Sequence, residues 1–368
     1  MSLNCGIVGL PNVGKSTIFS ALSSAPAEAA NYPFCTIEPN VGIVSVPDER
    51  IKKISSFVTT QKEIPATVEF VDIAGLVAGA SKGEGLGNRF LASIRQVGVL
   101  VHVVRCFTNE DIIHVSNKVD PASDIETINI ELALADLESV ERRYDRLSKM
   151  SRLDKESAKQ TQAVLPLLAR LKESLSEGIG IRQLGLSDDE KKLISDLHLI
   201  TIKPVLYVCN IDEESIEGGN EYTRIVEEIA AQENSLVVPI CGKIESEIAA
   251  LESSEERTEF LESVGLHESG LNHLIRSGYE TLGLRTFFTA GEKETRAWTF
   301  KEGTKAPQAA GIIHTDFEKG FIRAEVYHCD DLFHYKSEAK VKEAGKLRLE
   351  GKEYVVRDGD VMHFRFNV

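Results

Sequence analysis

The sequence predicts an α/β protein in which a mainly parallel sheet is interrupted by a long helical insertion and followed by a β-rich module. Three observations indicate this fold class. A glycine-rich loop joins an apolar run to a helical stretch near the start of the chain. Residues 124–176 repeat apolar side chains at helical spacing, and residues 281–368 alternate as strands do. A chain of 368 residues has room for two or three domains.

The first expected strand, Asn4–Val8, leads into Gly9-Leu10-Pro11-Asn12-Val13-Gly14-Lys15-Ser16, which has the spacing G-x-x-x-x-G-K-S. A helical stretch, 17–22, follows. In this order of strand, loop and helix, backbone N–H groups and the helix N-terminus converge on phosphate oxygens. Lys15 is expected on the β and γ phosphates and Ser16 on Mg²⁺. The expected nucleotide-binding residues are therefore Asn12, Val13, Gly14, Lys15, Ser16 and Thr17.

A second motif follows a strand expected at 68–72, which is apolar and β-branched and runs into Asp72-Ile73-Ala74-Gly75. Asp72 can hold Mg²⁺ through water, and the Gly75 N–H can sense the γ phosphate. Between the two motifs, the Pro- and Asn-rich segment 31–40 carries Thr36, which is expected to close on Mg²⁺ when triphosphate is bound. Motifs in this order are typical of a switch-type nucleotidase rather than of a kinase or a transporter ATPase.

The base-binding motif is expected after a strand at 204–209, where the sequence reads Asn210-Ile211-Asp212-Glu213. Guanine-specific proteins of this kind carry N-K-x-D there. Here Ile211 replaces the lysine, and Glu213 brings a carboxylate with one extra methylene. An asparagine or a backbone carbonyl suits adenine N6, and an unpaired buried polar group costs on the order of 1–3 kcal/mol. We therefore expect ATP over GTP; the alternative is a degenerate guanine site that still binds GTP.

These motifs resemble those of the YchF/Obg-like ATPase family, and the resemblance runs from residue 2 to 368. Matching stretches are 9–17, 31–42, 72–87, 210–213, 241–245 and 351–360. Most members carry Ser-Ala-Lys-Ile-Glu where this chain has Cys241-Gly242-Lys243-Ile244-Glu245, in a loop whose backbone helps to hold the base. The resemblance implies that Cys241, Gly242 and Lys243 bind the nucleotide. It also implies an ATPase of low intrinsic rate that associates with the ribosome, as the 50S subunit or 70S particle, including rRNA.

Hydrolysis needs a group that orients water, and Leu76 stands where many switch GTPases have glutamine. Family members with this hydrophobic residue place a histidine in the loop after the next strand. The matching residue is His114, which the resemblance implies as the catalytic, water-positioning group. The alternative is a loop histidine with no role. We expect His102, inside the strand at 99–104, to be a core residue.

Asn12 is a candidate for a second cation. In related P-loop proteins an asparagine at this place helps to bind K⁺ beside the phosphates, and the resemblance therefore suggests potassium-stimulated hydrolysis. The alternative is that the Asn12 side chain stabilises its own loop through an Asx-type hydrogen bond.

Composition favours a cytoplasmic protein with no membrane span. The hydrophobic content is 42%, and no apolar run reaches the ~18 residues of a membrane helix. The net charge of −15 argues against a simple nucleic-acid coat, and we expect no DNA partner and a monomer. The six cysteines lack metal-ligand spacing and are expected to be reduced. Cys35 lies in the first expected switch, so its alkylation is expected to slow turnover.

The positions of the motifs set the expected domains. The P-loop domain takes 1–123 and 200–280, an inserted coiled-coil-like helical hairpin takes 124–199, and the last domain takes 281–368. One apolar face of the hairpin comprises Ile128, Ile130, Leu132, Leu134, Leu137, Val140, Tyr144 and Leu147, and another comprises Val164, Leu165, Leu167, Leu168, Leu171 and Leu175. The basic turn near Arg146, Lys149, Arg152 and Lys155 is either a solvated face or a partner-binding arm.

The last domain is expected to contain strands at 286–290, 294–300, 321–326 and 361–366, with a turn at 358–360. It resembles the ubiquitin-like β-grasp module called TGS. Residues 314–321 are either an RNA-facing surface or a packed hairpin turn.

Three functional classes follow. The first is an ATPase whose hydrolysis times its stay on the ribosome. The second is an interaction module that ATP locks in one conformation, an alternative that Leu76 keeps open. The third is an Obg-type GTPase.

Overall fold

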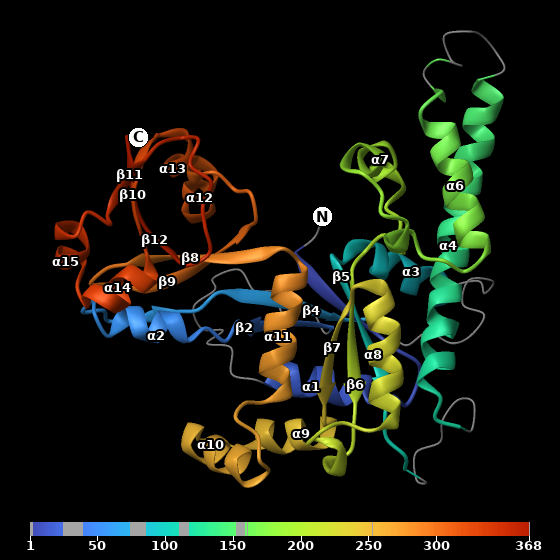
Figure 1. The fold of residues 1–368 in the computed structure, drawn as a ribbon, viewed down its shortest axis with the longest axis horizontal. Coiled ribbons are helices and arrows are strands. Elements are labelled where there is room, and N and C mark those ends of the chain that lie inside the picture. The colour runs from blue at the N-terminus through green and yellow to red at the C-terminus, as the bar shows by residue number, and fades with distance from the viewer. Residues whose placement is uncertain are drawn as a thin grey trace. The chain divides into compact units, whose positions relative to one another are not determined.

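A computed structural model describes residues 3–24, 40–73, 86–109, 118–151, 159, 161–251 and 253–367, and for 86–89 only the backbone. Figure 1 shows their elements along the chain. The described residues form two compact units. The first contains 3–24, 40–42 and the described part of 69–274, and the second contains 43–68 and 275–367.

The sheet that carries the N-terminal motifs has the strand order β2-β4-β1-β5-β6-β7. Its strands are β1 (Asn4–Val8), β2 (Val41–Ser45), β4 (Thr67–Asp72), β5 (Val99–Arg105), β6 (Val205–Asn210) and β7 (Leu236–Ile240). From β4 to β7 all neighbouring strands pair in parallel, which confirms the expected parallel sheet. Every residue of β5 and β6 is buried, as in strands covered on both faces.

The helices that follow these strands in the first unit begin where loops return from the sheet. They are α1 (Lys15–Ser24), α3 (Leu86–Gln96), α8 (Glu221–Glu233), α9 (Gly242–Ala250), α10 (Ser254–Ser263) and the start of α11 (Gly270–Thr281), whose residues from 275 on belong to the second unit. Asn220 caps α8 and Ser253 caps α10, each through its side chain, so the sequence itself sets where these helices start.

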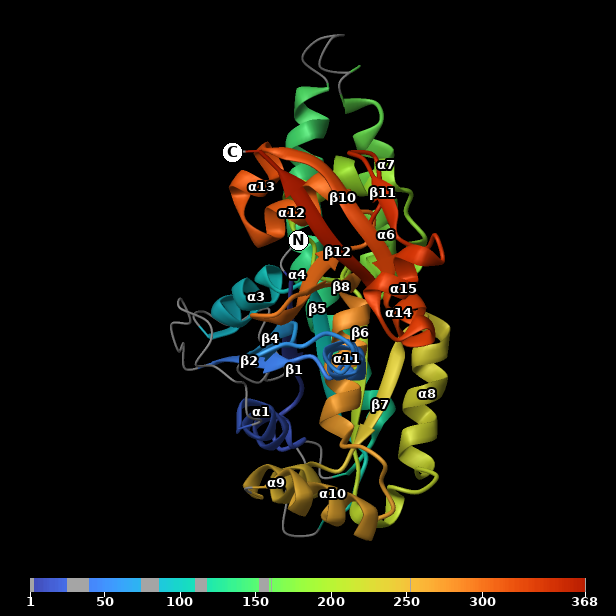
Figure 2. The same ribbon diagram turned by 90° about the vertical axis from the view of Figure 1, so that its left-hand side faces the viewer.

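The helical insertion is built on α4 (Pro121–Met150) and α6 (Val164–Ser176), which lie side by side in both ribbon views (Figures 1 and 2). Its core contains Ala133, Val140, Val164, Leu167, Leu168, Leu171 and Leu175. The expected apolar face was wrong for Ile130 and Leu134, which are 42% and 38% exposed. They follow Ile128 and Leu132 by two residues, and side chains two apart do not share a helix face.

Polar groups hold the insertion to the segment that returns to the sheet and to α8. Asp136 is fully buried, and its carboxylate accepts from the N–H groups of Ile200 (2.8 Å) and Thr201 (2.7 Å). Burial raises the pKa of Asp136, while these donors oppose the shift. Arg182 pairs with Glu233 at 2.9 Å on the way back to the sheet. Short elements complete this return: η2 (Ile181–Leu184), α7 (Asp188–Leu193) and η3 (Ser195–Leu197). A further short helix, η4 (Glu213–Ser215), follows β6.

The second unit contains a mixed sheet with the order β11-β10-β12-β8-β9-β3. Its strands are β3 (Glu63–Ile64), β8 (Leu284–Ala290), β9 (Thr295–Lys301), β10 (Phe321–His328), β11 (Arg348–Glu350) and β12 (Asp360–Phe366). β12 pairs in parallel with β8, while β10 with β12 and β8 with β9 are antiparallel. This confirms the expected C-terminal strands and their mixed, grasp-like arrangement.

Helices of the second unit are α2 (Glu49–Ser55), α12 (Ala306–Ile313), α13 (Thr315–Lys319), α14 (Cys329–Tyr335) and α15 (Glu338–Glu343). The alternative of a hairpin turn at 314–321 was wrong, because α13 occupies most of it. The ring of Phe317 stacks on Phe366 with centroids 3.7 Å apart, and His314 caps α13 by accepting from the Asp316 N–H. Residues 315–319 therefore form a helix whose Phe317 ring packs on Phe366 of β12.

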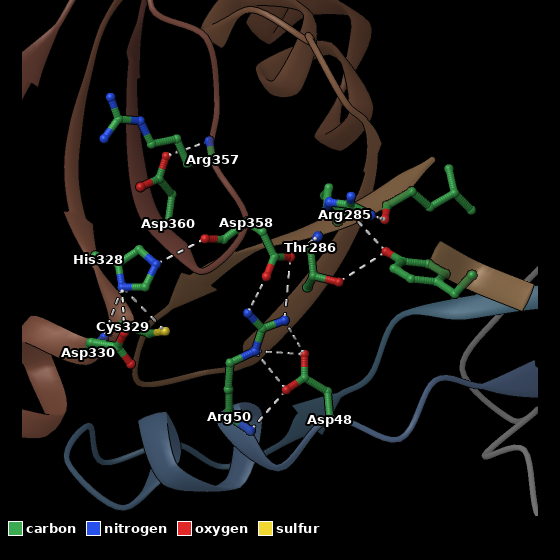
Figure 3. Close-up of polar contacts among 12 residues, drawn as sticks. Asp48, Arg50, Arg285, Thr286, His328, Cys329, Asp330, Arg357, Asp358 and Asp360 are labelled. Atoms are coloured by element: carbon green, nitrogen blue, oxygen red, sulfur yellow. Dashed lines mark hydrogen bonds and ion pairs between the residues drawn. The ribbon is translucent and has the colours of Figure 1, made fainter. Parts of the chain in front are cut away.

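Residues 43–68 belong to this second unit, which the sequence did not indicate. β3 pairs in parallel with β9, and Arg50 in α2 bonds Asp358 (Figure 3). The ring of Phe333 in α14 lies 4.2 Å from Lys53 Nζ. The expected domain boundaries stay a prediction, and the compact units divide the chain along other lines.

Two expectations from composition concern the whole chain. Within the described ranges, no helix is long and apolar enough to span a bilayer. The described cysteines are free and buried: Cys5, Cys106, Cys209, Cys241 and Cys329. Cys35 lies outside the described residues.

Candidate functional site

The glycine-rich loop takes the backbone shape that its residue types allow. Gly14 has φ 92° and Asn12 has φ 62°, both in the left-handed region that glycine and asparagine adopt most readily. A side chain at Gly9 would meet the backbone oxygen of Val103 at 2.7 Å, so the loop packs closely on β5. The loop ends where α1 begins, at Lys15.

Lys15 is 9% exposed, and its ammonium pairs with the Asp72 carboxylate at the end of β4. Ser16 and Thr17 are exposed at the start of the helix. The structure therefore brings the two N-terminal motifs together at the carboxyl ends of neighbouring parallel strands, β1 and β4.

Asn210 links this loop to the loops after β6 and β7, where base binding is expected. Its Nδ2 donates to the Val13 carbonyl at 2.9 Å, and its Oδ1 accepts from the Gly242 N–H at 3.1 Å. The side chain is 5% exposed, and a Cβ on Gly14 would overlap Asn210 Nδ2. Gly14 is therefore required for this bridge. Direct contact of the Asn210 amide with a base stays a prediction, and the geometry supports a role in holding three loops together.

A cavity of about 1450 Å³ opens where these loops meet. Its lining includes the expected residues Asn12, Gly14, Lys15, Ser16, Thr17, Asn210, Ile211, Glu213, Cys241, Gly242 and Lys243. Val13 lies beneath it, 1% exposed. Four residues of the expected chemistry, Thr36, Gly75, Leu76 and His114, lie outside the described residues.

At the base side of the cavity, Glu213 Oε1 and Lys243 Nζ form an ion pair at 2.5 Å. This bond raises the pKa of Lys243. Asp212 also lines the cavity, but its carboxylate already has a partner. Its Oδ1 caps η4 by accepting from the Ser215 N–H at 3.0 Å. Ile211 is 5% exposed and lies where N-K-x-D proteins have lysine.

The departure at Cys241-Gly242 lies at the start of α9. Cys241 is 6% exposed, and burial raises the pKa of its thiol. A Cβ at Gly242 would lie 3.1 Å from Asn210 Oδ1, which is tight, so glycine fits the bridge without displacing Asn210. The departure is compatible with the geometry of this loop.

Sequence reasoning did not single out the start of the loop after β5, which forms part of the cavity wall, or the charge behind it. Phe107, Thr108 and Asn109 line the cavity, and Arg105 is 1% exposed behind them. The available signal was the arginine itself, at the end of a strand that is apolar except for His102. His102 in the same strand is 3% exposed, as expected for a core residue, and burial lowers its pKa to about 3.

Glu245 was part of a recognised motif but had no expected role. It is 2% exposed, and burial raises its pKa to about 7. Its Oε1 accepts from the Gly270 N–H at 2.7 Å, at the start of α11. Glu245 thus ties α9, which carries residues 242 and 243, to the start of α11.

Two family models match the chain. One, described as "50S ribosome-binding GTPase", matches residues 4–141. The other, YchF-GTPase_C, is described as "Protein of unknown function (DUF933)" and matches residues 284–367.

Several named proteins match over the whole chain. The "Ribosome-binding ATPase YchF" of Bacillus subtilis is 56% identical over 370 residues, and that of Escherichia coli O157:H7 is 55% identical over 368; both cover 100% of each chain. The solved structure of the Schizosaccharomyces pombe YchF GTPase has a TM-score of 0.89 at 38% identity, covering 99% of this chain and 97% of its own. A GTP-binding protein from Pyrococcus horikoshii, 20% identical with a TM-score of 0.60, shares the fold.

Proposed function

The chain belongs to the YchF family, and on this premise we propose that it binds ATP with Mg²⁺, hydrolyses it slowly to ADP, and associates with the ribosome. The cavity carries this proposal. Lys15 and Ser16 open onto the same space as Ile211 and Glu213, so one ligand can meet the phosphate loop and the base loops together.

The phosphate end has the groups that a triphosphate needs. Residues 12–17 offer backbone N–H groups and the N-terminus of α1, and Lys15 offers its ammonium. Lys15 pairs with Asp72 in the structure. We infer that a bound triphosphate gives Lys15 a second anionic partner and draws its ammonium toward the phosphates.

Mg²⁺ fits the donor set at this end. The Ser16 hydroxyl and the Asp72 carboxylate are hard oxygen ligands of the kind that Mg²⁺ prefers, and Thr36 is proposed as a further ligand. The ion would neutralise phosphate charge at this place. Asn12 is exposed, and its backbone φ lies in the left-handed region; it is the proposed K⁺ contact.

For catalysis we propose His114 as the water-positioning group, because Leu76 cannot hydrogen-bond water. This part of the proposal depends on family resemblance and on the chemistry of imidazole.

The base preference is supported by the Glu213–Lys243 pair. A carboxylate already bonded to an ammonium is a poorer acceptor for guanine N1–H and N2–H₂, and Ile211 offers the base only apolar contact. We therefore propose adenine over guanine. The second candidate is an Obg-type GTPase, which is favoured by the family description "50S ribosome-binding GTPase" and by the name YchF GTPase for the fission-yeast relative.

The deciding experiment is equilibrium binding of fluorescent ATP and GTP analogues, with Mg²⁺ and either K⁺ or Na⁺. A tenfold preference for ATP corresponds to about 1.4 kcal/mol and supports the proposal. Equal or tighter GTP binding overturns the base preference. ATP turnover, measured separately in the same two salts, tests the Asn12 site: a higher rate in K⁺ than in Na⁺ supports it, and equal rates contradict it.

Ribosome association is tested separately by co-sedimentation with 70S particles and 50S subunits, with ATP, ADP or no nucleotide. Binding that depends on nucleotide, with faster ATP turnover on the ribosome, supports an ATPase that times its stay. Binding with unchanged turnover favours the nucleotide-gated interaction module. A cytoplasmic, monomeric protein is part of the same proposal.

A further inference from the structure

Arg105 is a charged side chain buried at the end of a central strand. It is 1% exposed and is among the largest fully buried side chains of the described chain. In the parallel pairing of β5 and β6 it lies opposite Asn210. Burying a charge is costly unless it is bonded, so the contacts of Arg105 indicate what it does.

The guanidinium holds the loop that follows it. Nε donates to the Phe107 carbonyl at 3.2 Å, and Nη2 donates to the Asn109 carbonyl at 3.2 Å. The guanidinium carbon also lies 4.6 Å from the centre of the Phe107 ring. Burial lowers the pKa of Arg105, and the negative charge of Asp124, in the first turn of α4, opposes this shift. The Arg105 side chain therefore holds two backbone carbonyls and the Phe107 ring of this loop in place.

The same loop is tied to the base-side loop by its backbone. The Cys106 N–H donates to the Asn210 carbonyl at 2.8 Å, and the Cys106 carbonyl accepts from Asn220 Nδ2 at 2.8 Å. Asn220 Nδ2 also donates to Ser215 Oγ at 2.9 Å, and Ser215 Oγ donates to Asp212 Oδ1 at 2.5 Å. The loop after β5 and the loop after β6 thus form one hydrogen-bonded wall.

We propose that Arg105 is a positioning residue of the nucleotide site, which fixes residues 107–109 as the part of the wall that meets the nucleoside. This rests on the proposed function. Phe107, Thr108 and Asn109 bring a phenyl ring, a hydroxyl and an amide to the cavity but no cationic side chain. Such groups suit a nucleoside, whereas Lys15 and the N-terminus of α1 suit the phosphates.

The test separates the two ends of the ligand. Calorimetric binding of MgATP and of Mg-tripolyphosphate is measured for the wild type, Arg105→Met and Arg105→Lys. We expect Arg105→Met to bind ATP about tenfold more weakly, because the two carbonyls lose their donors, and to bind tripolyphosphate within about twofold of the wild type. Arg105→Lys keeps the charge near Asp124 but cannot bond both carbonyls, so its loss should be intermediate.

Arg95→Met is the matched control. Arg95 also donates to backbone carbonyls, those of Leu197 and His198 at 3.4 and 3.3 Å, but it does not line the cavity. Both ligands should bind this variant as they bind the wild type, even if its unfolding midpoint falls.

The outcomes are distinct. Equal weakening of ATP and tripolyphosphate by Arg105→Met, or unchanged ATP binding, overturns the inference. If Arg105→Met is not obtained folded, the ratio of the two affinities in Arg105→Lys decides by the same criterion. A wild type that binds tripolyphosphate but not ATP refutes the proposed function instead.

Discussion

Arg50 bonds Asp358, which lies 308 positions further along the chain, with 2.6 Å between Nη1 and Oδ2 (Figure 3). The other oxygen of Asp358 accepts from the Thr286 N–H at 2.8 Å. Burial lowers the pKa of Arg50, but its bonds to Asp48 and Asp358 outweigh this and hold the pKa above its usual value. The chain between the two N-terminal nucleotide motifs is in this way bonded to the C-terminal strands.

The Arg50–Asp358 pair should contribute measurably to the stability of the second unit. We expect Arg50→Met and Asp358→Asn each to lower the unfolding free energy by about 1 kcal/mol, a modest figure because both side chains are partly exposed and screened by solvent. In urea unfolding, the double variant should lose less than the sum of the single losses. The exposed pair Lys305–Glu353 is the control, with a coupling close to zero. Strict additivity at Arg50 and Asp358 contradicts a direct bond.

Removing the C-terminal strands should damage residues 43–68. A chain ended at residue 283 lacks β9 and α14, which are the partners of β3 and of Lys53. We therefore expect new protease cleavage within 43–68 and a lower unfolding midpoint, which limited proteolysis and calorimetry measure. A truncated chain that resists protease at 43–68 as the full chain does is the contrary result.

Glu245 should make stability depend on pH. Its pKa is raised by burial from 4.5 to about 7, so the folded chain holds a proton that the unfolded chain releases within this window. This proton uptake contributes fully to the free energy of unfolding below pH 4.5, and the contribution is lost as the pH rises through about 7. Glu245→Gln should be more stable than the wild type at pH 8 by on the order of 3 kcal/mol, and similar to it at pH 4.5.

Urea unfolding between pH 4.5 and 8 measures this difference, with the exposed Glu247→Gln as the control. Stability curves for Glu245→Gln and the wild type that stay parallel across the range would refute the assignment.

Asn210 should hold the nucleotide site together through both ends of its amide. Asn210→Asp places a carboxylate oxygen against the Val13 carbonyl, where Nδ2 now donates at 2.9 Å. We expect a loss of ATP affinity of at least about tenfold and a lower unfolding free energy by about 1–3 kcal/mol. The binding of tripolyphosphate should weaken too, because the Asn210 bridge supports the phosphate loop itself. Full ATP affinity in the folded variant is inconsistent with the bridge.

Base preference should respond to the two replaced motif positions. The double variant Ile211→Lys with Glu213→Asp restores N-K-x-D and shortens the carboxylate that now bonds Lys243. We expect the ratio of GTP to ATP affinity to rise at least about tenfold. Binding of both fluorescent analogues measures it. An unaltered ratio in the double variant shows that other groups select the base.

Local patterns predicted the elements that carry strong local signals. The strands β1, β4, β5 and β6 are rich in apolar and β-branched residues, and the loop at 9–16 has fixed spacing, so both were found from the sequence. The segment 43–68 was missed, since β3 has only two residues and α2 has seven, too few for a periodic pattern. The position of this segment depends on the bond between Arg50 and Asp358, which are 308 positions apart. No local sequence pattern indicates such a contact.

The sequence identified residues of the candidate site but not the contacts that they make in the folded chain. The motif identified Asn210, yet only the structure shows both ends of its amide occupied, by Val13 and Gly242. Arg105 was missed because a single arginine after an apolar strand is also what a solvent-exposed strand end looks like. Its importance depends on burial and on the carbonyls that fold back over it, which are properties of the folded loop.

The pairing of β3 with β9 has a consequence for how such genes recombine. A C-terminal module that folds by itself can be exchanged between relatives by a single crossover. Here the second unit takes part of its structure from residues 43–68, so a crossover near residue 280 joins strands of one parent to an α2 and β3 of the other. Hybrids that take both stretches from one parent should be more stable than hybrids that divide them between the parents. The two stretches are therefore expected to be inherited together.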